Sequence, residues 1–247
     1  MNFKSWLLNE ERNNFKKKLI DQYGKYKVYV VDGEAVRNSS PAAEEFGGSA
    51  IHANISTVPE NEIWIEDDID ESETKMMIAS TLHELKALEN GMSPGKAYEK
   101  RLEKEKDYRE SQHLSKQNPL GTDKPAKKSI HIQLYGKIKA ENMEVWLVNG
   151  HKVRDLHKCD FIEGGQPAVY SFVPNNEIWV EKGPHLNTEA PLLILHEFVE
   201  FIIMKYKKMK YDKAHEIAAK IEFKHRGKSF SKEDALALTK EKVLEMV

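Results

Sequence analysis

Apolar residues occupy nearly every position between 192 and 204, which predicts a helix buried on all sides. Pro191 suits the first turn of that helix. A second helix is expected from Asp212, a plausible N-cap, with an apolar stripe formed by Ala214, Ile217, Ala218 and Ile221. Near the C-terminus, Ser231 and Asp234 form a capping-box pattern that predicts a closing helix.

Other segments carry strand patterns. β-branched runs at 28–31 and 145–148 end in Asp-Gly and Asn-Gly, dipeptides that favour a hairpin turn. The segments NEIWIE (61–66) and NEIWVE (176–181) alternate polar and apolar residues, as in a strand with one buried face. Strands followed by two helices predict an α+β unit with a short antiparallel sheet.

This series of elements is written twice. VYVVDGEAVRN (28–38) matches VWLVNGHKVRD (145–155), and VPENEIWIE (58–66) matches VPNNEIWVE (173–181). Three shorter matches keep the same order, namely FGGSA with EGGQP, LHE (82–84) with LHE (195–197), and MSPGKAYEK with MKYDKAHEI. Collinear matches indicate a tandem duplication. We expect an N-terminal repeat with a leader helix (1–110), a polar linker (111–129) and a C-terminal repeat (130–247).

Composition narrows the partners and the compartment. The chain has 247 residues, and its 38 basic and 40 acidic side chains leave a net charge of −2, which gives no reason to expect nucleic acid as a partner. Cys159 is the single cysteine, so no disulfide can form within the chain. The sequence has neither a signal-peptide pattern nor an apolar run long enough to span a membrane. We expect a cytoplasmic protein.

The predicted buried helix also carries charged groups. His196 and Glu200 are four residues apart and therefore share one face. Burying both is costly unless something pairs with them, and a metal ion would do so. His215 on the next helix completes a set of two histidines and one carboxylate, which suits zinc and leaves a position for water. Glu197 is adjacent, where H-E-x-x-H metalloproteases have the general base.

HEFVE (196–200) followed by YDKAH (211–215) resembles the zincin metallopeptidases, particularly the gluzincin branch. The whole of 130–225 is similar to a group of uncharacterised phage and prokaryotic proteins with VDG–VR, EGG, NEIW, HE-x-x-E and Y-x-x-AH motifs. The resemblance implies a peptidase in which an edge strand beside the active-site helix binds the substrate, and NEIWVE fits that strand. The ligand order differs from the family pattern: the second ligand position has Glu200 in place of histidine, and the third has His215 in place of glutamate.

The first repeat offers an internal contrast. His83 and Glu84 match His196 and Glu197, but Ala87 and Tyr98 take the places of the other two ligands. We therefore expect a degenerate, non-catalytic first repeat that braces the second or binds a partner.

Simpler explanations exist for each candidate. His196 could be a hydrogen-bonded core histidine, Glu200 the partner of a lysine, and His215 a solvent-facing residue. Glu222 fits a solvated charge, a group that hydrogen-bonds to a metal ligand, or an alternative ligand, and Tyr211 fits packing or polarisation of a substrate carbonyl. The lysine-rich stretch 205–213 fits a solvated loop.

The leading hypothesis is a peptidase with one Zn²⁺ per chain, acting on a protein or peptide substrate. The alternative is a non-catalytic binding or structural protein built on the duplicated scaffold, virion-associated if the chain is phage-encoded. A carboxylate-rich redox metal site is a weaker option, because it needs paired E-x-x-H motifs on facing helices of a bundle, which the α+β pattern does not predict.

Overall fold

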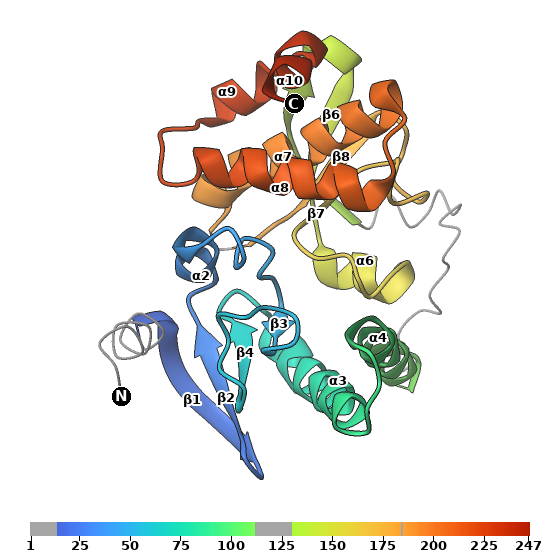
Figure 1. Cartoon of the computed structure of the whole chain (residues 1–247). Coiled ribbons are helices and arrows are strands. Elements are labelled where there is room, and N and C mark those ends of the chain that lie inside the picture. The colour runs from blue at the N-terminus through green and yellow to red at the C-terminus, as the bar shows by residue number, and fades with distance from the viewer. Residues whose placement is uncertain (1–13, 112–129, 184) are drawn as a thin grey trace. The chain divides into compact units, whose positions relative to one another are not determined.

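The computed structural model describes residues 14–111, 130–183 and 185–247. The chain divides into two compact units, residues 1–112 and 113–247, and each contains a small sheet followed by helices (Figure 1). The predicted α+β class is confirmed. The predicted leader helix before residue 14 and residues 112–129 of the predicted linker lie outside the described residues.

The first unit has a sheet of order β1-β2-β4-β3. Its strands are β1 (Lys16–Tyr23), β2 (Tyr26–Val31), β3 (Ser49–Ala50) and β4 (Glu62–Glu66). Its helices are α2 (Gly33–Ser39), α3 (Glu71–Glu89) and α4 (Pro94–Ser111).

The second unit repeats this plan with the order β5-β6-β8-β7. Its strands are β5 (His131–Ile138), β6 (Met143–Val148), β7 (Gly164–Gly165) and β8 (Glu177–Glu181). Its helices are η1 (Lys139–Glu141), α6 (Gly150–Leu156), α7 (Leu186–Lys207), α8 (Tyr211–His225), α9 (Lys232–Leu236) and α10 (Lys240–Met246). The predicted capping box is present at Ser231, although the C-terminal segment forms two short helices.

Each sheet is mixed rather than purely antiparallel, because β2 pairs with β4, and β6 with β8, in parallel. The predicted hairpins at Asp-Gly and Asn-Gly are therefore wrong. Asp32 instead caps α2 by accepting a hydrogen bond from the Ala35 amide, and Asn149 caps α6 in the same way. An Asx side chain can cap a helix as readily as it can enter a turn, and parallel strands need a crossover between them.

The glycine after each cap permits a close contact. A Cβ on Gly33 would lie 2.1 Å from Glu66 Oε1, so no larger residue fits there. Glu66 pairs with the buried Arg37 of α2. In the second unit Arg154 holds Glu181 through two hydrogen bonds of 2.7 and 2.9 Å. The repeated D/N-G-x-x-V-R motif thus fastens a short helix to the end of a strand.

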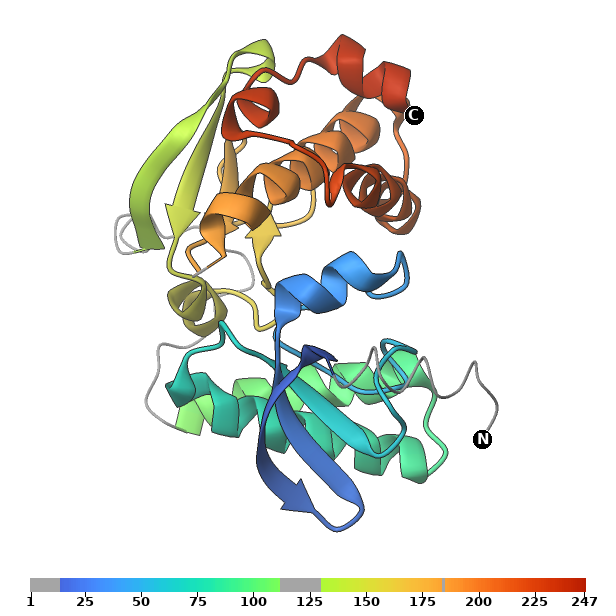
Figure 2. The same ribbon diagram turned by 90° about the vertical axis from the view of Figure 1, so that its left-hand side faces the viewer.

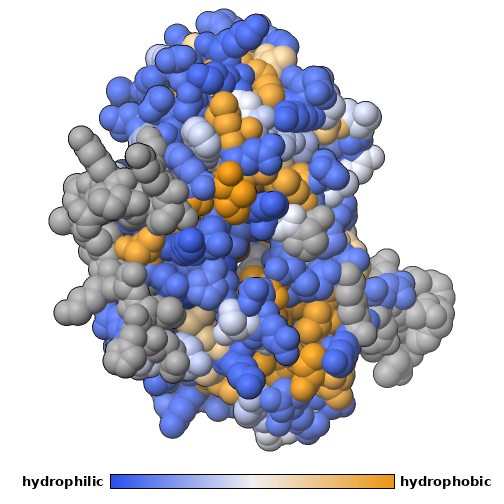
Figure 3. Space-filling view, turned by 180° about the vertical axis from the view of Figure 1, so that it is seen from behind, coloured by the Kyte–Doolittle hydropathy of each residue, from blue (hydrophilic) through white to orange (hydrophobic). Residues whose placement is uncertain are grey.

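Helices and loops cover both faces of each sheet. In the second unit the helical hairpin α7–α8 covers one of these faces (Figure 2). Ile178 and Val180 of β8 pack with that hairpin, whereas Trp179 packs with Val153 of α6 on the opposite face. The prediction of one buried face for NEIWVE is therefore wrong. Large apolar side chains such as Ile132 also reach the surface, where Figure 3 shows apolar patches among hydrophilic residues.

Helix α7 begins before the predicted first turn, so Pro191 lies inside the helix. Helix α8 begins at Tyr211, with Lys210 at the N-cap position rather than Asp212. Among the described residues, no helix is long and apolar enough to cross a membrane.

Candidate metal centre

The helical hairpin α7–α8 brings the three predicted ligands together. His196 Nε2 and Glu200 Oε2 each approach His215 Nδ1, both at 3.0 Å. His196 Nε2 lies 3.8 Å from Glu200 Oε2. His196 and Glu200 are buried, whereas the side chain of His215 is 30% exposed, which leaves the cluster open on one side.

These separations suit a tetrahedral ion. Zinc–ligand bonds of about 2.0–2.1 Å give ligand–ligand distances of about 3.3 Å in a tetrahedron. The three distances of 3.0, 3.0 and 3.8 Å lie on either side of that value. Two imidazole nitrogens and one carboxylate oxygen are also the donor types that zinc prefers. The residues therefore fit a zinc ion with a fourth position available.

The second nitrogen of His196 is also held. Nδ1 lies 2.9 Å from Glu222 Oε2, an arrangement that directs the Nε2 lone pair toward the cluster. Glu222 Oε1 accepts a hydrogen bond from Arg226, which also contacts both carboxylate oxygens of Glu189 at 2.9 and 3.1 Å. Glu222 is only 2% exposed, so its interpretation as a solvated charge is wrong, and it contacts the ring nitrogen of His196 that faces away from the cluster.

Glu200 is oriented by Gln166, which sequence analysis missed. The Gln166 side-chain amide donates to Glu200 Oε1 at 2.9 Å, and its own oxygen accepts from the Ala168 amide at 2.7 Å. Gln166 is fully buried. Glu200 Oε2 therefore remains directed at the histidines. The only sequence signal was the position of Gln166 directly after the second glycine pair.

Glu197, the predicted general base, lies beside β7. A Cβ on Gly164 would come within 3.1 Å of Glu197 Oε1, so a glycine at this position gives the carboxylate room. Burial and the negative charge of Glu200 raise the pKa of Glu197 to about 8. The sheet edge next to Glu197 is β7, because β8 lies between β6 and β7. The expectation that NEIWVE forms the edge strand is therefore wrong.

The surroundings of the other two buried groups favour the charged form of each. Burial alone would raise the pKa of Glu200, but hydrogen bonds from His196, His215 and Gln166 lower it to about 2. Burial alone would lower the pKa of His196, but hydrogen bonds to Glu200 and Glu222 raise it well above its usual range. A cation at this position would be stabilised by the same charges.

Tyr211 stands at the start of α8, one turn before His215. The two rings stack with their centroids 5.3 Å apart, and the Tyr211 side chain is exposed. This contact supports the packing interpretation of Tyr211 and puts an aromatic surface at the open side of the cluster.

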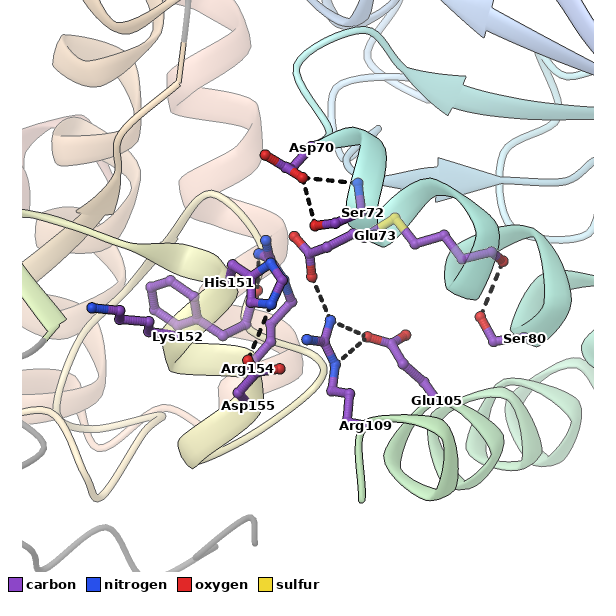
Figure 4. Close-up of polar contacts among 12 residues, drawn as sticks. Asp70, Ser72, Glu73, Ser80, Glu105, Arg109, His151, Lys152, Arg154 and Asp155 are labelled. Carbon is purple, nitrogen blue, oxygen red and sulfur yellow. Dashed lines mark hydrogen bonds and ion pairs between the residues drawn. The ribbon is translucent and has the colours of Figure 1, made fainter. Parts of the chain in front are cut away.

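Each unit buries one arginine between two glutamates of its helical hairpin. In the first unit Arg109 contacts Glu73 of α3 and Glu105 of α4 (Figure 4). The same arrangement in the second unit consists of Arg226, Glu189 and Glu222. The paired arginines are 117 positions apart in the sequence, and the glutamates on the first helix of each hairpin are 116 apart.

The sheets give the same correspondence. Ser49 pairs with Ile65 of β4, and Gly164 pairs with the equivalent Val180 of β8, so Ser49 and Gly164 are equivalent residues. The predicted match of the two glycine pairs is therefore wrong by two residues. Thr81 Oγ1 lies 3.0 Å from Ser49 Oγ, as the Glu197 carboxylate lies against Gly164. Thr81 therefore corresponds to Glu197, again at an offset of 116.

The two LHE tripeptides are therefore not structurally equivalent, because the sequence match aligns them one helical turn away from the true correspondence. Glu84 corresponds to Glu200 rather than to Glu197, and Ser80 takes the place of His196. His83 is exposed, whereas Glu84 is fully buried. The predicted correspondences of His83, Glu84 and Ala87 are therefore wrong, because identical residues on a helix can match at the wrong turn.

The first unit supplies its own cation to this carboxylate. Glu84 accepts a hydrogen bond of 2.8 Å from Asn54, and Arg101 Nη1 lies 3.5 Å from the other oxygen of Glu84. Arg101 also donates to Ser49 Oγ at 2.7 Å. At an offset of 117, the residue corresponding to Arg101 is the buried Ala218. The second unit thus lacks the arginine that faces Glu84 in the first.

The fold and the cluster define a duplicated α+β protein with a candidate metal centre in its second unit. No protein-family model matches the chain, and neither a curated protein nor a solved structure matches it. Its chemistry must therefore be inferred from its own residues.

Proposed function

We propose that the second unit is a zinc-dependent peptidase whose ligands are His196, Glu200 and His215. The observation that carries the proposal is the triangle of donor atoms at 3.0, 3.0 and 3.8 Å. His196 and Glu200 are each oriented by a further buried side chain, Glu222 and Gln166. Such outer contacts are typical of metal sites, where they fix the direction of each ligand.

Comparison between the units supports a cation at this position. The buried Glu84 of the first unit is accompanied by Arg101, whereas Glu200 faces two histidines and has Ala218 at the corresponding position. A buried carboxylate needs a compensating positive charge. A divalent ion would provide that charge and would also relieve the repulsion between Glu197 and Glu200.

Glu197 is the residue that would accept a proton from the attacking water. It follows the ligand His196 directly, and its buried carboxylate lies against Gly164 of β7. When bound, zinc lowers the pKa of water and polarises a carbonyl oxygen. The choice of a peptide bond as substrate follows from the resemblance of the HEFVE and YDKAH segments to zincin peptidases. We also propose a cytoplasmic location, because the chain has a single, buried cysteine, Cys159.

The first test is the metal content of the purified protein by mass spectrometry. We expect about one zinc per chain, its loss in His196→Ala, and its retention in the matched control His83→Ala. Absence of zinc from the parent, even after zinc is offered, would refute the metal site.

Glu197→Gln separates binding from turnover. The variant should keep zinc and lose cleavage of a casein or peptide-library substrate, because only the proton acceptor is removed. Zinc in both proteins with no cleavage by the parent would favour the non-catalytic alternative. Cleavage by the variant at the parental rate would refute the role of Glu197.

A further inference from the structure

A strongly basic segment connects the two helices of the metal centre. Five of the nine residues from 205 to 213, here called the basic loop, are lysines, and one is acidic. Lys205 is engaged by Glu141 at 2.7 Å. Lys207, Lys208 and Lys210 are exposed, and among the described residues the structure gives them no ion pair. Their charges are therefore available to an external anion.

The helical hairpin itself does not require this charge. The corresponding segment of the first unit, 88–96, contains one lysine and one glutamate. Both segments connect two antiparallel helices in the same fold. The lysines therefore accompany the metal centre rather than the architecture.

The conformation of Lys208 supports the same conclusion. Lys208 ends α7 in the left-handed region with φ of 52°, where the corresponding residue of the first unit is Gly91 with φ of 81°. Glycine is favoured at such a helix end because a side chain is strained there. A lysine kept at a position that favours glycine indicates a use for its charge.

The basic loop also lies next to the open side of the cluster. It includes Tyr211, whose ring stacks on His215. Lys210 precedes Tyr211 directly, and Lys207 and Lys208 lie four and three residues before it in the chain. A ligand that reaches His215 past the Tyr211 ring would therefore meet the segment that carries these lysines.

We propose that the basic loop binds acidic side chains of the peptide substrate and so gives the peptidase a preference for acidic sequences. This inference rests on the proposed function of the same centre. A peptide suits the chain better than nucleic acid does, because the whole chain carries a net charge of −2, which does not favour a continuous phosphate backbone.

The test measures binding of fluorescent peptides to full-length, zinc-loaded protein carrying Glu197→Gln. Three peptides of equal length would differ only in having glutamate, glutamine or lysine at the variable positions. We expect the acidic peptide to bind most tightly at low salt and less tightly as salt rises. Lys207→Gln, Lys208→Gln and Lys210→Gln together should weaken its binding about tenfold, the effect of three exposed ion pairs, and leave the neutral peptide unchanged.

The matched control removes the same charge from exposed lysines of α4, through Lys96→Gln, Lys104→Gln and Lys106→Gln, and should not change binding. Lys208→Gly should weaken binding of the acidic peptide while raising the unfolding midpoint by about 2–4 °C. A purely structural lysine would not give this opposite pair of effects.

Several results would overturn the inference. These are equal binding of acidic and neutral peptides, no effect of the loop substitutions, or displacement of the acidic peptide by a lower concentration of an oligonucleotide. Failure of the proposed function is distinguishable. Loop-dependent binding of the acidic peptide without cleavage by the parent would refute the peptidase activity but support acidic-peptide binding by the basic loop. Cleavage without a preference for acidic peptides would refute only the role of the basic loop.

Discussion

Replacing Glu222 by glutamine tests whether His196 acts as a metal ligand. Glu222 Oε2 lies 2.9 Å from His196 Nδ1, and Oε1 accepts from Arg226. Glutamine keeps the size of the side chain but removes its charge. Glu105 of the first unit makes the same contact with Arg109, and no histidine among the described residues contacts its other oxygen. Glu105→Gln therefore controls for the lost ion pair.

The two substitutions should differ in one quantity only. Each leaves its arginine paired with a second glutamate, so each should lower the free energy of unfolding by about 1–3 kcal/mol. Removing the carboxylate behind a ligating histidine typically weakens metal binding 10- to 100-fold, or about 1.4–2.7 kcal/mol. That loss is expected for Glu222→Gln alone.

Zinc affinity would be measured by competition with a chromophoric chelator, and stability by urea unfolding with and without zinc. The reasoning would be refuted if Glu222→Gln kept the parental zinc affinity, or if Glu105→Gln reduced it equally. A glutamine that lowered stability but not affinity would leave Glu222 as a structural partner of Arg226.

Three further outcomes are expected. His215→Ala should reduce zinc affinity at least 10-fold, measured by the same competition, while His83→Ala should not, because His83 is exposed on the other unit. Gly150→Ala should cost about 1–3 kcal/mol in urea unfolding, since a Cβ there would lie 1.9 Å from a glutamate carbon, whereas Gly95→Ala meets nothing within 4 Å and should cost nothing. Arg101→Ala should destabilise the first unit by about 3–5 kcal/mol, because it leaves a buried carboxylate without its cation, and unchanged unfolding would contradict that account.

The sequence predicted the α+β class and the central elements of each unit, because their apolar patterns are long and regular. It gave no sign of β1 and β5. Both are edge strands with two register shifts each, so their side chains do not keep a simple alternation of buried and exposed residues. It also mistook two helix caps for hairpin turns, since Asp-Gly and Asn-Gly serve both purposes.

The candidate site was predictable where its residues follow helical spacing. His196 and Glu200 are one turn apart, and His215 lies on the next helix, so their meeting could be anticipated. Gln166 comes from a loop far away in the sequence, and its contact depends on how that loop crosses α7. Arg226 was missed because a lysine- and arginine-rich sequence offers no sign of which cation becomes buried.

The correspondence between Glu84 and Glu200 has a consequence for how the two halves differ. The first unit has Glu84 at the position of the proposed ligand Glu200. It also has Glu105 at the position of Glu222, the residue that contacts His196 in the second unit. What separates it from a metal-binding unit is the identity of a few side chains on two helices, chiefly Ser80, Tyr98 and Arg101. Exchanging these side chains would convert one set of buried groups toward the other with no change of fold, and that path is open to a protein engineer in either direction.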